Sequence, residues 1–101
     1  MELKTYYLCL LRKGPAWTPE ETPELARLQE QHVAHNLSDV ASGVKLAAGP
    51  VDDGSDIRGI SIFQTATLDE ARAIAEADPG VRVGRFVVEL HPWMVPVGML
   101  P

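Results

Sequence analysis

The chain has 101 residues, of which 46% are hydrophobic, and its 9 Lys and Arg against 14 Asp and Glu give a formal net charge of -5. This length and composition predict one globular domain over residues 1–101. The acidic balance, with no basic cluster, argues against nucleic acid or an anionic membrane as the partner. The one cysteine, Cys9, has no second thiol to pair with, which favours a reducing, cytoplasmic location.

The first predicted elements are a strand and a long helix. Thr5–Leu11 is rich in aromatic and aliphatic residues and reads as the strand. The loop that follows holds two helix-start signals, at Thr18–Glu21 and at Thr22–Glu24, and either of them fits the beginning of the helix. The helix is predicted from about Pro23 to Ser42 and should end at Gly43, a good C-cap residue.

This helix has an apolar side and a polar side. The apolar side is expected to face the core, and its members are Ala26, Val33, Leu37, Val40 and Ala41. Leu25 and Leu28 lie at the edge of that side, and His32 projects between them. His35 lies one step further out, among polar residues.

The second half of the chain predicts two strands, a helix and a last strand. Val44–Pro50 and Ile57–Thr65 are the strands, separated by an acidic turn. The helix begins after Thr67, which opens a capping box, and halts at Asp78–Gly80. The last strand is predicted over Val81–Trp93.

Two further features complete the outline. Gly84 is interpreted as a bulge in the last strand, and residues from about 94 to 101 as a tail interrupted by prolines. The resulting β-α-β-β-α-β order predicts an α+β, ferredoxin-like protomer. Its antiparallel sheet carries both helices on one face.

The predicted sheet has large apolar side chains on both faces. Two helices cover only one face, so the other is expected to be covered by a second copy of the chain through a two-fold contact. We therefore expect a homodimer. Cys9 and Phe63 are assigned to the face that the second copy covers.

The histidines are the main candidates for chemistry. His32 and His35 are three residues apart on the helix, and only His91 is available as a third metal ligand, without a defined spacing to the other two. No metal is expected, because a catalytic zinc needs about three protein ligands. No redox cofactor is expected either, because the chain has neither a glycine-rich phosphate loop nor a cysteine pair.

A His–carboxylate dyad is the alternative. His32 with Asp78 can serve as an acid–base pair, since histidine titrates near neutrality and a carboxylate orients it. From spacing alone, ordinary turn chemistry for Asp78 and a packed His32 are the more common interpretation. Trp17 and Trp93 fit the walls of a pocket for a planar ligand equally as well as rim packing.

Three segments, His32–Pro50, Arg58–Val81 and Gly84–Trp93, occur in an order and spacing that resemble the YciI-like, or YCII-related, family of small bacterial proteins. The resemblance implies a ferredoxin-like protomer that dimerises into an α/β barrel. It also implies a site built on one histidine and one aspartate, which by motif position are His32 and Asp78.

The expected function follows from this site. Gly49, Pro50, Arg58 and Trp93 are assigned to substrate binding. We expect a homodimeric enzyme that binds a small molecule and uses the dyad for isomerisation or elimination on a small cyclic or aromatic substrate. The alternatives are a non-catalytic binding or accessory module and a purely structural interaction domain.

Overall fold

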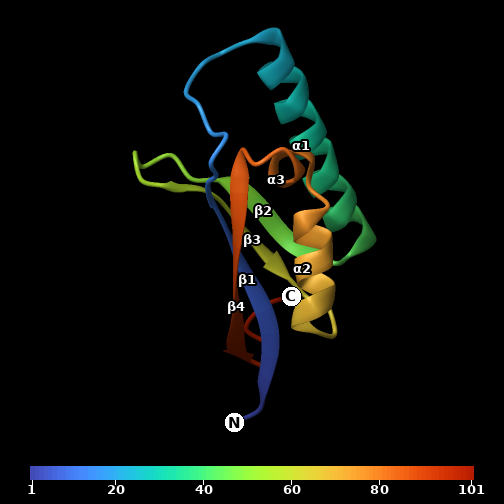
Figure 1. The fold of residues 1–101 in the computed structure, drawn as a ribbon. Helices are drawn as coiled ribbons and strands as arrows, with labels where there is room; N and C mark the ends of the chain where they lie inside the picture. The colour runs from blue at the N-terminus through green and yellow to red at the C-terminus, as the bar shows by residue number, and fades with distance from the viewer.

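A four-stranded antiparallel sheet carries all the helices on one face in the computed structural model, which describes residues 1–101 (Figure 1). The strand order is β2-β3-β1-β4. This arrangement confirms the predicted ferredoxin-like βαββαβ fold. The elements are β1 (Leu3–Lys13), α1 (Pro23–Ser42), β2 (Lys45–Pro50), β3 (Ile57–Phe63), α2 (Leu68–Glu76), α3 (Pro79–Arg82) and β4 (Phe86–Pro96).

The ends of α1 are set by local chemistry. The Thr22 hydroxyl accepts a hydrogen bond from the backbone N–H of Leu25 at 3.1 Å, so the second of the two helix-start signals is the one used. Thr18 instead accepts from the N–H of Glu20 and makes a turn. At the other end, Gly43 adopts a left-handed φ of 87°, as a C-cap glycine should.

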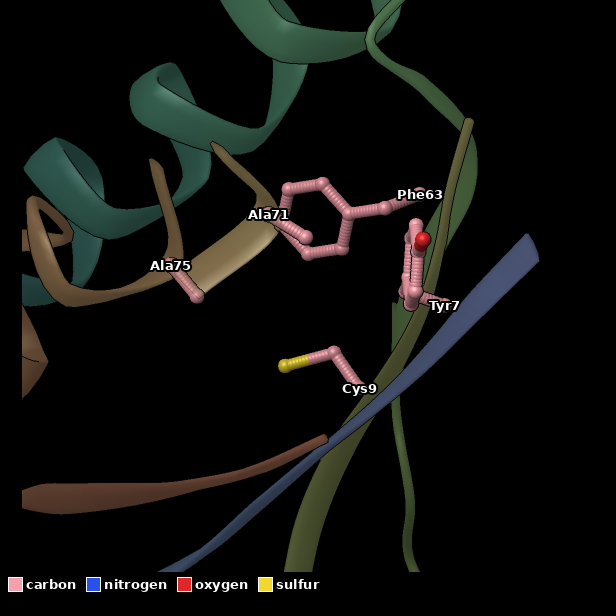
Figure 2. Packing of buried hydrophobic residues seen from close by; sticks show 5 residues of the cluster. All are labelled: Tyr7, Cys9, Phe63, Ala71 and Ala75. Carbon is pink, nitrogen blue, oxygen red and sulfur yellow. The ribbon is translucent and has the colours of Figure 1, made fainter. Parts of the chain in front are cut away.

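The apolar core lies between the sheet and α2. Tyr7, Cys9 and Phe63 come from the sheet, and Ala71 and Ala75 come from α2. Figure 2 shows the Phe63 ring and the Cys9 thiol on the side of the sheet that faces this helix. The assignment of Cys9 and Phe63 to a dimer face is therefore wrong. Small alanines on α2 leave room for a large ring from the sheet, so the helix packs over these residues.

The opposite face of the sheet carries no helix. On it, Leu8 lies opposite Ile62 and Tyr6 opposite Trp93, and Leu10 is paired with Ile60. Three of its apolar side chains are about two-fifths exposed: Ile60, Val87 and Trp93. The expectation of one uncovered apolar face is confirmed. The uncovered face is the one opposite Cys9 and Phe63, not the one that carries them. We call this surface the bare face.

The chain between α2 and β4 differs from the prediction. Pro79–Arg82 forms the short helix α3, so Val81 and Arg82 are not the start of the last strand, because Asp78 caps the N-terminus of this helix. Gly84 lies in the turn before β4 with a φ of 79°, so it is not a bulge inside the strand. β4 continues to Pro96 by pairing with Leu3–Thr5, so the expected tail begins later than residue 94.

The side of α1 that contacts the rest of the protein is not the apolar side. All five residues of that side are exposed, including Leu37 at 65%, and none of the residues of α1 is fully buried. The contacting side instead carries Leu28, His32, Asn36 and Asp39, each half-buried. Lys45 on β2 and Asp78, the N-cap of α3, hold this side through polar contacts, and the expected orientation was wrong for that reason. None of the helices combines the length and apolar character needed to cross a membrane.

Candidate functional site

A cavity of about 830 Å³ lies between α1, the loop that precedes it and one end of the sheet. It exists because α1 contacts β2 and α3 but does not pack flat on β1, whereas α2 does contact β1 and β4. Figure 1 shows the connection between β1 and α1 crossing the same end of the molecule. The size falls within the range of pockets that bind small molecules.

His32 and Asp78 meet in the wall of this cavity. The Nδ1 atom of His32 is 2.6 Å from Oδ1 of Asp78, and their side chains are 13% and 5% exposed. The other carboxylate oxygen, Oδ2, accepts from the backbone N–H groups of Gly80 and Val81 at 2.9 and 3.2 Å. Asp78 therefore makes both of the contacts that the sequence left as alternatives. With both oxygens held, its carboxylate is fixed in orientation.

Gly80 allows this turn to pack closely. A Cβ atom at Gly80 would lie 2.7 Å from the Phe86 ring and 3.0 Å from Oδ2 of Asp78, distances that side chains do not tolerate. Phe86 in turn lies against His32, with 5.3 Å between the ring centroids. The absence of a side chain at Gly80 thus lets the Asp78 turn, Phe86 and the histidine ring share one small volume.

The second polar neighbour of the His32 ring is the side-chain amide of Asn36. Nζ of Lys45 is 2.7 Å from Oδ1 of Asn36. Lys45 must be the donor in this contact, because an ammonium group cannot accept a hydrogen bond. This orientation turns the Asn36 amide NH₂ toward Nε2 of His32, at 3.4 Å. An NH₂ group only donates, so in this contact Nε2 is the acceptor, and the Asp78 carboxylate accepts from Nδ1–H. Lys45 itself is held at 3.0 Å from Asp39.

This arrangement has the elements of a general base. Nδ1 of His32 is committed to Asp78, which leaves Nε2 as the nitrogen available to a substrate. The carboxylate would stabilise the imidazolium formed when Nε2 takes a proton. The 3.4 Å contact with Asn36 is long for a hydrogen bond and easily displaced.

Cys9 lies in the floor of the same cavity. Burial raises the pKa of its thiol, outweighing a hydrogen bond with Ser61 and the nearby charge of Lys45, both of which act in the opposite direction. A protonated thiol is a weak nucleophile, so the side chain acts here as a small apolar group.

The structure brings most of the predicted site residues together. Gly49, Pro50 and Arg58 line the cavity with His32 and Asp78. Trp93 does not line the cavity, so the structure does not bring it together with the other predicted site residues. It pairs across the strands with Tyr6 on the bare face, because strand alternation turns it away from the helices. Trp17, the other tryptophan, does line the cavity.

Asn36, Lys45 and Phe86 are among the cavity residues that were not predicted. Lys45 had a signal in the sequence, since it is a lone cation in a short apolar strand. Lysine is almost never fully buried unless it is paired, and here it is 5% exposed.

The remaining histidines have other partners. His35 contacts the backbone oxygen of Ile74 and the carboxylate of Asp39, and His91 pairs with Glu89 on β4. No group of three or more His, Cys, Asp or Glu side chains is placed to hold a metal ion.

Comparisons with known proteins agree with this fold. Residues 5–94 match the YCII-related domain. The structure superposes on that of 5-chloro-2-hydroxyhydroquinone dehydrochlorinase from Burkholderia phenoliruptrix AC1100, in complex with 2,5-dihydroxybenzoquinone. The TM-score is 0.54 at 20% sequence identity, over 87% of this chain and 92% of the dehydrochlorinase. No curated protein matches the sequence. At this identity the structural likeness establishes the fold alone.

Proposed function

The chain belongs to the YCII-related domain family, and we propose that it is a small-molecule enzyme in which His32 and Asp78 carry out acid–base chemistry. The substrate class that we propose is a small cyclic or aromatic compound, and the reaction is an isomerisation or an elimination. The observation that carries this proposal is the 2.6 Å contact between the two side chains in the wall of a cavity large enough for such a molecule.

The proposed reaction begins with proton abstraction. Nε2 of His32 takes a proton from a C–H or O–H group of the substrate, and the electron pair left behind moves into the ring. Asp78 stabilises the resulting imidazolium through the Nδ1 proton. In an isomerisation His32 returns the proton to a different atom of the substrate. In an elimination the electron pair expels a leaving group, and the proton passes to that group or to water.

The cavity supports a ring-shaped substrate. Phe86 and Trp17 line it as flat apolar surfaces, while polar groups lie around the dyad. The dehydrochlorinase with the similar fold was solved with 2,5-dihydroxybenzoquinone, a six-membered ring that a cavity of about 830 Å³ can hold. Chemistry on such a ring needs a positioned base and, in the elimination case, no oxidant.

Proton abstraction is measured directly by hydrogen exchange. The protein is incubated in D₂O with 2,5-dihydroxybenzoquinone and with 5-chloro-2-hydroxyhydroquinone, while NMR follows the ring protons and an electrode follows chloride release. We expect His32→Asn to lower a protein-dependent rate by about 10²-fold or more. His91→Asn is the matched control, because His91 does not line the cavity and pairs with Glu89. Equal rates in wild type and His32→Asn contradict the proposal, and saturable binding without turnover favours a binding or accessory module.

We also propose that the chain forms a homodimer through the bare face, in the cytoplasm. The exposed Ile60, Val87 and Trp93 side chains support the contact, since an isolated sheet face with such groups is costly in water. The single free thiol of Cys9 supports a reducing compartment. Light scattering tests the assembly: Ile60→Glu should convert a dimer into a monomer of 11.0 kDa. A wild-type protein of that mass contradicts the dimer.

A further inference from the structure

Three cations surround one tryptophan at the rim of the cavity. The distance from the centroid of the Trp17 ring is 4.3 Å to Nζ of Lys13, 5.7 Å to Cζ of Arg58 and 5.9 Å to Cζ of Arg85. The cations come from the end of β1, from β3 and from the turn before β4, so only the fold brings them together. We call this group the Trp17 cluster.

No carboxylate forms an ion pair with the Trp17 cluster, although the charge of Arg58 is among the causes that lower the pKa of the exposed Asp53. None of the ion pairs in the chain includes Lys13, Arg58 or Arg85. The hydrogen bonds of the arginines go to backbone oxygens, including Ser55 for Arg58 and Thr18 for Arg85. Backbone oxygens fix the direction of a guanidinium group and leave its net charge in place.

The surroundings make this arrangement unusual for a chain with a net charge of -5. All three cations are half-buried, so their mutual repulsion is screened less than it would be in open water. Glu20, Glu21 and Asp52 also line the cavity, but they are exposed and do not pair with the cluster. The indole offsets part of the repulsion through cation–π contacts, and a bound anion would offset more.

The Trp17 cluster lies one aromatic ring away from the dyad. The Cζ atom of Arg85 is 5.7 Å from the centroid of Phe86, and the Phe86 ring is 5.3 Å from that of His32. Arg58, Arg85, Trp17, Phe86 and His32 all line the same cavity. A molecule the size of a substituted ring can therefore contact the cluster and His32 at the same time.

We propose that the substrate is a small organic acid whose oxyanion is held by Arg58 and Arg85 beside Trp17, while its ring lies at His32. The second half of this statement rests on the proposed function. Paired guanidinium groups match planar oxyanions. We assign the oxyanion as a carboxylate, with one negative charge, because acidic side chains share the cavity and disfavour a doubly charged phosphate.

Trp17 provides the readout. Trp93→Phe, outside the cavity, leaves Trp17 as the only indole, because the chain has two tryptophans. At constant ionic strength, cyclohexanecarboxylate should change the fluorescence of Trp17 saturably, and the neutral cyclohexanecarboxamide should not. Arg58→Gln and Arg85→Gln should each weaken the binding of the carboxylate by about 10-fold or more. Arg27→Gln, an exposed position on α1 with the same change of charge, should have no effect.

The outcomes separate this inference from the proposed function. If wild type shows no turnover and carboxylate binding survives His32→Asn, the anion site is supported and the proposed enzymatic function is contradicted. Turnover that depends on His32 but is unchanged by Arg58→Gln contradicts the anion site and supports the proposed enzymatic function. An equal response to carboxylate and carboxamide, no saturable response to carboxylate, or tighter binding of inorganic phosphate than of carboxylate overturns the assignment. Circular dichroism checks that each variant is folded.

Discussion

The two helices that cover the sheet do so in opposite ways. The small alanines of α2 pack onto Phe63 and Cys9 and make an apolar core. α1 is held by polar side chains such as His32, Asn36 and Asp39, and a cavity remains beneath it. The comparison indicates that the half under α2 supplies most of the stability, while the half under α1 keeps polar groups available for a ligand.

The largest effect that tests this contrast is expected at Phe63. The side chain is fully buried, so Phe63→Ala should lower the free energy of unfolding by about 3–5 kcal/mol. Leu37→Ala, on the exposed side of α1, should change it by less than about 0.5 kcal/mol. Chemical denaturation measures both. Similar losses at the two positions would show that α1 is packed as tightly as α2.

Gly80 gives a smaller effect with a distinct signature. The added methyl group of Gly80→Ala meets the Phe86 ring, and such overpacking costs about 1–3 kcal/mol. The same methyl group displaces the Asp78 turn, so binding or turnover in the cavity should fall as well. Gly49→Ala is the matched control for stability alone, because a Cβ atom at Gly49 meets nothing within 4 Å although the residue lines the cavity. Equal stability of the two variants would mean that the Phe86 ring moves aside freely.

The two helix caps allow a direct test of the two halves. Thr22 caps α1 and Thr67 caps α2, each by accepting a backbone N–H at 3.1 Å. Replacement of either by alanine should cost about 1 kcal/mol. Only Thr22→Ala should also weaken carboxylate binding in the cavity, since α1 forms its wall. A loss of binding in Thr67→Ala as large as in Thr22→Ala would contradict this division of roles.

The smallest expected effect is the pH dependence due to Cys9. Burial raises the pKa of the folded thiol, so the unfolded chain loses its proton first as pH rises. The stability that depends on this group is fully present below the ordinary thiol value of about 8.5 and is lost as pH climbs above it. The unfolding free energy of wild type should therefore fall more steeply above that pH than that of Cys9→Ala. Parallel curves would show that the thiol is not desolvated.

Local signals in the sequence were sufficient for the elements and their order. Thr22 and Gly43 mark the ends of α1 through contacts with their own neighbours, so both ends were predictable. Alternation along the strands predicted a bare face, but not which face, because the choice depends on where α2 packs. The helical turn after Asp78 was missed because the alternating valines that follow resemble a strand.

The candidate site was predictable only in part. His32 and Asp78 are 46 residues apart, and the family resemblance, not their spacing, suggested the pair. The orientation of α1 was wrong because its polar partners Asp78 and Lys45 are on other elements and outweigh its apolar side. Arg58 and Trp17 were named singly as ligand-binding candidates, but nothing in the sequence joined them to Lys13 and Arg85, since the cations approach one another only after the sheet has formed.

One carboxylate in this protein serves both the fold and the proposed dyad. Asp78 gives one oxygen to the histidine and the other to the amides that begin α3. A homologue without the proposed activity would still need the aspartate to form the turn, so evolution would retain it. His32 caps nothing, and its Nδ1 contact is with Asp78 alone. Among homologues, an aspartate at this position is therefore poor evidence of activity, and the presence or absence of the histidine is the trait to inspect.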